Sequence, residues 1–204
     1  TAPVKGVFSP EEKAIYEIVL KALETGTKAC VVGADYREVD AVARKVINDG
    51  LVALGIVKAG ERHPYFPHGI GHHLGLDVHD RGAYGILEPG MILTVEPGIY
   101  IPEGSPTDPK WWKIGIRIED NILITKDGNE NLSEFVPRTI ADIEKLMKRK
   151  LPVMPLPEIK GGKTADPFFY KPYQAGAAPA GGVQASHQAS LDDRNPDQPI
   201  ANPI

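Results

Sequence analysis

The hydrophobic positions in the first part of the chain follow a helical period. Ser9, Pro10 and Glu12 form a typical helix start, with Ser9 as the N-cap and Glu12 placed to complete a capping box. The pattern that follows predicts an amphipathic helix ending near Glu24. Its apolar positions are Ile15, Ile18, Val19, Ala22 and Leu23.

A second helical series follows, and Gly50 is the stop signal at its predicted end. The apolar positions of this second helix are Val39, Val42, Ala43, Val46 and Ile47. Because each helix has one apolar face, we expect both to cover one side of a sheet.

From residue 91 the period changes to two, which is typical of strands. Residues 91–96 are predicted to form a strand with Thr94 and Glu96 on one face, and Pro97 and Gly98 end it. The alternation places the Glu96 carboxylate on one face of the strand and the apolar Leu93 and Val95 on the other.

A second strand is predicted to begin at residue 114 and to continue to residue 124. Its isoleucines alternate with Gly115, Arg117 and Glu119, so Arg117 and Glu119 emerge on the same face. Residues 126–129 are a predicted turn, and Thr139 caps a last helix to about residue 150.

Composition restricts the classes of partner. The chain has 204 residues, 42% of them hydrophobic, with a net charge of -4. Without clustered Lys and Arg we expect no nucleic acid and no anionic membrane as partner, and no apolar run has the length of a bilayer span. The single cysteine, Cys30, reads as a buried apolar residue. A cytoplasmic protein is the resulting expectation.

The composition changes after residue 150, which separates two regions. Prolines, glycines and alanines then interrupt any regular pattern. We therefore expect a folded region at 1–150 and a Pro/Gly/Ala-rich tail at 151–204.

Four of the six histidines of the chain lie within the thirteen residues 68–80, together with two aspartates. Histidine is both the commonest metal ligand and a proton shuttle near neutral pH. Two carboxylates from the predicted strands, Glu96 and Glu119, complete a ligand set with His72 that suits Mn²⁺, Co²⁺, Zn²⁺ or Fe²⁺. Since neighbouring residues of an extended chain face opposite sides, only one of His72 and His73 can face this set, and we select His72.

Each of these residues also has a structural interpretation. Glu96 and Glu119 are equally compatible with solvated strand carboxylates, Glu119 being paired with Arg117. His68 and His79 are equally compatible with hydrogen-bonded histidines of a core or loop.

Four ordered segments resemble the pita-bread metallopeptidases of the Xaa-Pro aminopeptidase and prolidase branch. They are His68-Gly-Ile-Gly-His72, Gly75-Leu-Asp-Val-His79-Asp80, the stretch from Leu87 to Tyr100 that contains Glu96, and Gly115-Ile-Arg117-Ile-Glu119-Asp120. The resemblance covers about residues 5–148. It implies an α+β pita-bread fold, with a curved antiparallel sheet covered by helices.

The resemblance also implies roles for single residues. His72 and Glu96 would each bind one of two divalent metals, with Mn²⁺ favoured over Co²⁺ or Zn²⁺, and Glu119 would bridge both. His68 and His79 match histidines that contact the substrate and stabilise the transition state, and Arg117 matches an arginine that supports the site. The implied reaction is hydrolysis of the peptide bond before proline, which releases the N-terminal residue.

One departure from the family pattern changes this expectation. The family site needs two further aspartates upstream of the segment that matches Thr1 to Phe8, and Asp35 and Asp40 match no ligand position. We therefore expect the chain to be the C-terminal part of an incomplete pita-bread domain. A complementary N-terminal fragment or chain would supply both aspartates, and self-association is also expected. Two alternatives remain: a prolidase acting on Xaa-Pro dipeptides, and a non-catalytic module of the same fold that binds peptides or proteins.

Overall fold

Two long helices pack against each other in the computed structural model, which describes residues 1–149. The predicted capping box of α1 (Pro10–Ala29) is present: Ser9 Oγ accepts from Glu12 N–H, and Glu12 Oε2 accepts from Ser9 N–H. The helix continues beyond its predicted end near Glu24. Its Gly26 is buried against the sheet, where an added Cβ would lie 3.1 Å from Val95 Cγ1.

The predicted stop at Gly50 is wrong, because α2 covers Tyr36–Ala53 and Gly50 lies inside it. A Cβ at Gly50 would lie 2.7 Å from Ile18 Cγ1 on α1. The glycine therefore serves the close approach of two helices, and this tertiary contact outweighs its low helix propensity.

The strands form two antiparallel sheets. One has the order β1-β4-β5, from Ile92–Val95, Asp120–Thr125 and Gly128–Asn131. The other pairs β2 (Gly98–Ile101) with β3 (Ile114–Arg117). The single strand predicted for residues 114–124 is therefore divided between two sheets, and the chain resumes pairing at Gly98, where the sequence predicted an end.

β1 and β2 follow each other along one extended stretch of chain, and β3 and β4 along another. The break between β1 and β2 lies beside the break between β3 and β4. Val95 is opposite Asp120 in one sheet, and Gly98 is opposite Arg117 in the other. Between these pairs lie residues 96–97 on one run and 118–119 on the other. Pro97 has no N–H to donate, which is one reason for the gap in the ladder. Both predicted carboxylate ligands, Glu96 and Glu119, lie in this double interruption.

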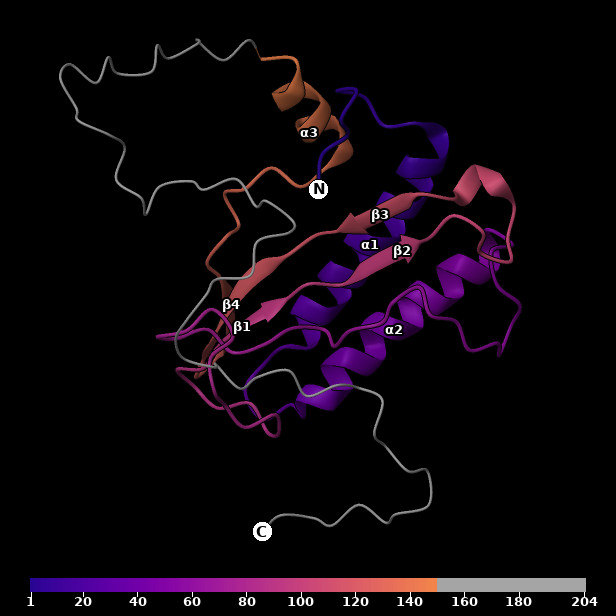
Figure 1. Ribbon diagram of the computed structural model, residues 1–204. Helices are drawn as coiled ribbons and strands as arrows, with labels where there is room; N and C mark the ends of the chain where they lie inside the picture. Colours follow the sequence, from indigo (N-terminus) through magenta and orange to yellow (C-terminus); the bar gives the residue numbers. More distant parts are fainter. Residues whose placement is uncertain (150–204) are drawn as a thin grey trace, which may run out of the picture. The chain divides into compact units, whose positions relative to one another are not determined.

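The core lies between α1 and the strands. Figure 1 shows α1 passing behind β2 and β3, and α1 contacts β1, β2 and β3 whereas α2 packs mainly against α1. A short 3₁₀ helix at Pro109–Trp111 precedes β3, and α3 covers Ile140–Met147, capped by Thr139 as predicted.

The tail predicted for 151–204 lies outside the described residues. None of the helices in residues 1–149 has the length and apolar character needed to cross a membrane.

The N-cap of α2 should make the stability of the protein depend on pH. Asp35 accepts from the guanidinium and the backbone N–H of Arg37, and these bonds lower the pKa of Asp35 to about 2. An unfolded aspartate titrates near pH 3.9. Since the unfolded chain binds the proton more tightly, this carboxylate stabilises the fold fully above about pH 4 and loses its contribution as the pH falls to about 2.

Asp35→Asn should therefore flatten the decrease in stability between pH about 4 and about 2. The measurement is the urea midpoint at steps across this range, with Asp127→Asn in the exposed turn after β4 as the control. Equal pH slopes for the wild-type protein and Asp35→Asn would contradict the assignment.

Candidate metal centre

An extended segment, residues 70–74, runs along β1 and carries His72. Glu96 N–H donates to the carbonyl of Ile70 at 2.7 Å, and Thr94 N–H donates to the carbonyl of His72 at 2.8 Å. Gly71 lies so close to β1 that an added Cβ would be 1.9 Å from the carbonyl oxygen of Thr94. Backbone pairing therefore fixes the position of His72 relative to Glu96.

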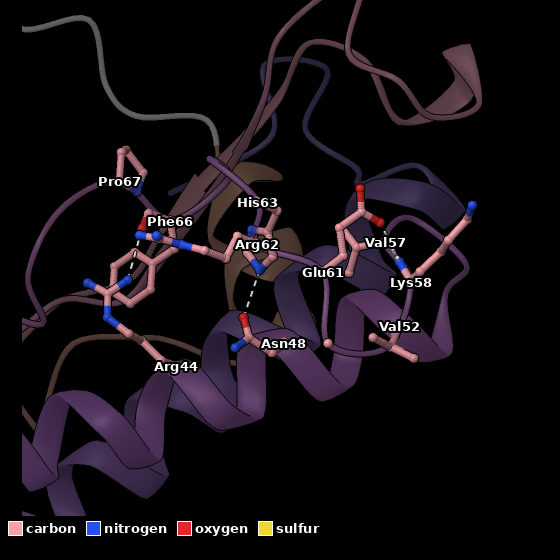
Figure 2. A pocket seen from close by; sticks show the side chains of 11 residues that line it. Arg44, Asn48, Val52, Val57, Lys58, Glu61, Arg62, His63, Phe66 and Pro67 are labelled. Carbon is pink, nitrogen blue, oxygen red and sulfur yellow. Dashed lines mark hydrogen bonds between the residues drawn. The ribbon is translucent and has the colours of Figure 1, made fainter.

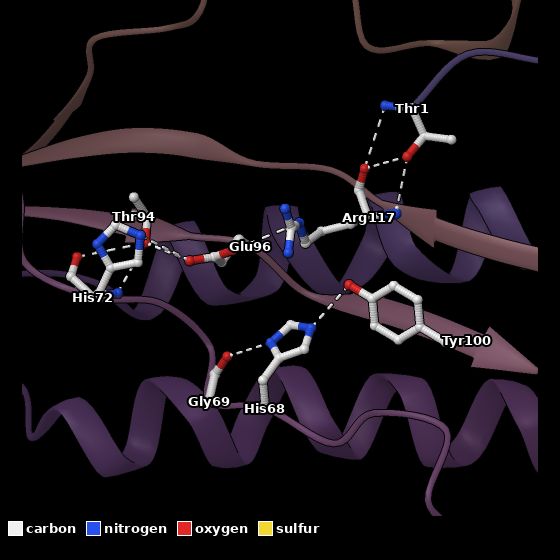
Figure 3. A network of polar contacts seen from close by, with 8 residues as sticks. All are labelled: Thr1, His68, Gly69, His72, Thr94, Glu96, Tyr100 and Arg117. Carbon is white, nitrogen blue, oxygen red and sulfur yellow. Dashed lines mark hydrogen bonds and ion pairs between the residues drawn. The ribbon is translucent and has the colours of Figure 1, made fainter. Parts of the chain in front are cut away.

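The three predicted ligands come together. Each of His72, Glu96 and Glu119 offers a ligand atom, and these atoms all lie within 4.8 Å of one another. His72 Nε2 is 3.2 Å from Glu96 Oε1, and Figure 3 shows both side chains pointing toward each other from neighbouring segments. Glu96 is buried and Glu119 is exposed, so the group reaches from the interior to the surface. An imidazole and two carboxylates in this arrangement fit a divalent cation.

Thr94 links two of these residues and was not among the site residues predicted from the sequence. Its Oγ1 accepts from His72 N–H at 2.9 Å and donates to Glu96 Oε1 at 3.0 Å. The hydroxyl is fully buried. The available signal was the period of two, which places Thr94 on the same face as Glu96. Thr94 therefore orients one carboxylate oxygen, leaving less rotational freedom in the side chain.

Arg117 lies on the other side of Glu96. Its Nε is 3.7 Å from Glu96 Oε2, and Figure 3 shows the guanidinium reaching toward that carboxylate. The alternative interpretation paired Arg117 with Glu119, but the ion pair found in the described part of the chain is with Glu96. Arg117 therefore pairs with the buried carboxylate of Glu96, and not with Glu119 as the alternative interpretation expected.

The other histidines of the segment lie around this group in different ways. The ring of His79 is 4.3 Å from the ring of His72, centroid to centroid, and is exposed. His73 is buried and turns away, with its Nε2 3.2 Å from the carbonyl oxygen of Ala83. The structure thus places His79 beside His72, at the edge of the group, and His73 outside it.

His68 is held further along, by Tyr100. His68 Nε2 is 2.9 Å from Tyr100 Oη, and His68 Nδ1 is 2.9 Å from the carbonyl oxygen of Gly69. Burial raises the pKa of Tyr100, although Arg117 opposes the shift. The phenol therefore keeps its proton near neutral pH and can donate to the imidazole. Tyr100 ends the Leu87–Tyr100 stretch that resembles the family, but its residue type alone gave no sign of this contact.

Thr1 lies next to Arg117, on the strand that precedes Glu119. Thr1 Oγ1 donates to the carbonyl of Arg117 at 2.6 Å and accepts from Arg117 N–H at 3.0 Å. Thr1, Tyr100, Arg117 and Glu119 line a common cavity of about 570 Å³.

The family model described as metallopeptidase family M24 matches residues 1–126. The chain belongs to metallopeptidase family M24. This confirms the resemblance and the expected α+β pita-bread fold. Family M24 takes its name from metal-dependent peptidases, so the His72, Glu96 and Glu119 group lies in a chain of the expected class.

Individual M24 members are similar over most of the described residues. The Xaa-Pro aminopeptidase of Escherichia coli (strain K12) is 45% identical over 160 residues, which cover 72% of this chain and 36% of the relative. The corresponding enzyme of Haemophilus influenzae is 46% identical, with 72% and 37% covered. A zinc-substituted E. coli aminopeptidase P in complex with product superimposes with a TM-score of 0.70 at 44% identity, with 74% and 38% covered. The chain thus spans little more than a third of the length of these relatives.

Proposed function

We propose that this chain contributes the C-terminal part of the active site of an Xaa-Pro aminopeptidase, which releases the N-terminal residue from peptides with proline in second position. The observation that carries the proposal is the convergence of His72, Glu96 and Glu119 from three separate segments, within 4.8 Å of one another. Similarity to Xaa-Pro aminopeptidases at 45% identity supports the substrate class.

The proposed cofactor is a pair of divalent cations. His72 and Glu96 would each hold one cation and Glu119 would bridge both, with Mn²⁺ preferred over Co²⁺ or Zn²⁺. Such a pair supplies Lewis-acid polarisation of the scissile carbonyl and activation of water near neutral pH.

The side chains around the proposed cations have separate tasks. His79, beside His72, donates a hydrogen bond to the negative charge that develops on the carbonyl oxygen of the substrate. His68 contacts the substrate next to the scissile bond, in an orientation set by Tyr100. Arg117 neutralises Glu96, and a carboxylate oxygen of Glu119 accepts and returns the proton of the attacking water.

Two further aspartate ligands complete the proposed site, and they would come from sequence upstream of Thr1 or from a second chain. Thr1 supports this part of the proposal, because its hydrogen bonds to Arg117 place it on the strand that leads to Glu119. A segment joined to Thr1, or docked beside it, would enter the cavity directly. Self-association of the protein stays a prediction.

The testing experiment measures composition and activity on the same material. Protein purified in its native form is analysed for intact mass under denaturing conditions, for co-purifying polypeptides and for metal content. Release of the first residue from Xaa-Pro-Yaa tripeptides, with two metals per active site, is the expected result.

The alternatives give different results in the same assay. Exclusive cleavage of Xaa-Pro dipeptides would favour a prolidase. Binding of proline-containing peptides with neither metal nor hydrolysis, in material containing all five ligands, would overturn the peptidase proposal in favour of a binding module.

A further inference from the structure

His68 lies in a loop that is fixed at both ends by backbone hydrogen bonds. At one end Tyr100 N–H donates to the carbonyl of Tyr65 at 2.9 Å, and at the other Glu96 N–H donates to the carbonyl of Ile70 at 2.7 Å. The four residues between these anchors, 66–69, follow no helix or strand. They include Pro67, which has no N–H, and a glycine. The position of His68 therefore depends on contacts from outside the loop.

Arg44, on α2, makes these contacts. Its Nη1 donates to the carbonyl of Phe66 at 3.0 Å and its Nη2 donates to the carbonyl of His68. The guanidinium also lies over the Phe66 ring, 4.3 Å from its centroid. Figure 2 shows Arg44 rising from α2 beneath Phe66, with its hydrogen bond to the Phe66 backbone. The Phe66 ring in turn meets the His68 ring edge-on at 4.9 Å.

Asp40 fixes the guanidinium itself. Arg44 Nε donates to Asp40 Oδ2 at 2.6 Å, one helical turn away on α2. The planar guanidinium thus donates three hydrogen bonds in fixed directions, one to the Asp40 carboxylate and one to each of two backbone carbonyls. A lysine ammonium is a single point donor and cannot span both carbonyls from the same backbone position.

We propose that Arg44 is a positioning residue for His68, and this inference rests on the proposed function of His68 in substrate contact. Arg44 joins α2 to the carbonyls of Phe66 and His68, so that the imidazole of His68 stays turned toward Tyr100. It contacts none of the proposed metal ligands. Its loss should therefore disturb His68 and leave metal binding by His72, Glu96 and Glu119 unchanged.

The environment of Arg44 allows a chemical rescue experiment. Its side chain is 37% exposed and lines an open pocket of about 620 Å³ together with Phe66 and Pro67. Arg44→Ala therefore leaves a space that is accessible from solvent, and alanine suits the interior of α2. Methylguanidinium added to the variant can enter this space and restore the planar donor, whereas methylammonium cannot. Lys45→Ala is the matched control, because Lys45 forms a similar ion pair one turn along the same helix with Asp49.

The main readout is backbone motion, measured as ¹⁵N order parameters of Phe66, His68 and Gly69 in the full chain. Values near 0.85 in the wild-type protein and in Lys45→Ala should fall below about 0.6 in Arg44→Ala. Methylguanidinium should restore them and methylammonium should not. Unchanged order parameters in Arg44→Ala would overturn the inference, whether or not the protein is a peptidase.

The second readout is turnover in the complete enzyme. Arg44→Ala should lower kcat/KM for Xaa-Pro peptides about tenfold or more, as expected for the loss of a hydrogen bond to a charged group, with unchanged metal content. Loss of metal together with activity would show a general structural role and contradict the inference. Wild-type protein without any peptidase activity would instead contradict the proposed function, and the order parameters would still decide the role of Arg44.

Discussion

In the completed enzyme of the proposed function, Glu119→Gln is expected to abolish peptidase activity and to lower divalent-metal affinity by at least about a hundredfold, the upper range for loss of an outer-shell partner. The neutral amide offers one oxygen where the carboxylate offers two, and it carries no charge to balance two cations. Glu119 is exposed and lies between β3 and β4, so the amide costs the fold little. The effect should therefore appear in metal content and turnover while the melting temperature of the metal-free protein stays unchanged.

Glu130→Gln is the control for this experiment. Glu130 is also an exposed carboxylate, on the neighbouring strand β5, and it lies outside the candidate metal centre. Both variants replace one exposed carboxylate by a neutral amide. Retained turnover and normal metal content in Glu119→Gln would rule out its assignment as the bridging ligand.

Gly71→Ala should destabilise the fold by about 3 kcal/mol, the sum expected for overpacking and for weakened hydrogen bonds. An added Cβ would lie 1.9 Å from the carbonyl oxygen of Thr94 and 2.7 Å from its hydroxyl. Because the obstacle is backbone, segment 70–74 must move away from β1. This movement stretches the hydrogen bond from Thr94 N–H to His72 and withdraws His72 from Glu96.

Gly69→Ala is the matched control, since a Cβ at Gly69 meets nothing within 4 Å. That variant should be within about 0.5 kcal/mol of the wild-type protein. Urea unfolding and metal titration of both variants make the comparison. Wild-type stability and metal content in Gly71→Ala would contradict the close approach of the segment to β1.

Periodicity predicted α1 and α2 because each has a single buried face, and it predicted β3 and β4 because buried side chains alternate along them with more exposed ones. Ser9 and Thr139 marked helix starts through local hydrogen bonds, which act within a few residues and can be read from sequence. Alternation along an extended chain similarly separated His72 from His73, which the structure places on opposite sides. These predictions succeeded because local geometry decides them.

Contacts between distant segments could not be predicted in the same way. Gly50 was predicted to be a helix stop from its residue type. Its packing against Ile18, which explains a glycine inside α2, depends on how α1 and α2 approach each other. The division of residues 114–124 between two sheets depends on the facing Pro97, which belongs to another strand. Arg44 gave no sign of its function because its two carbonyl partners lie more than twenty residues away along the chain.

The double interruption of the strands has a consequence for the stiffness of the molecule. Residues 96–97 and 118–119 lie side by side in this interruption. The backbone hydrogen bond found between them is long, 3.4 Å from Ile118 N to the carbonyl oxygen of Pro97. Backbone pairing is therefore weaker along this line than within either ladder. A cation shared by the two carboxylates would brace that line and slow amide hydrogen exchange at the adjoining ladder ends. Cation binding would thus set the rigidity of the surface that carries both carboxylates.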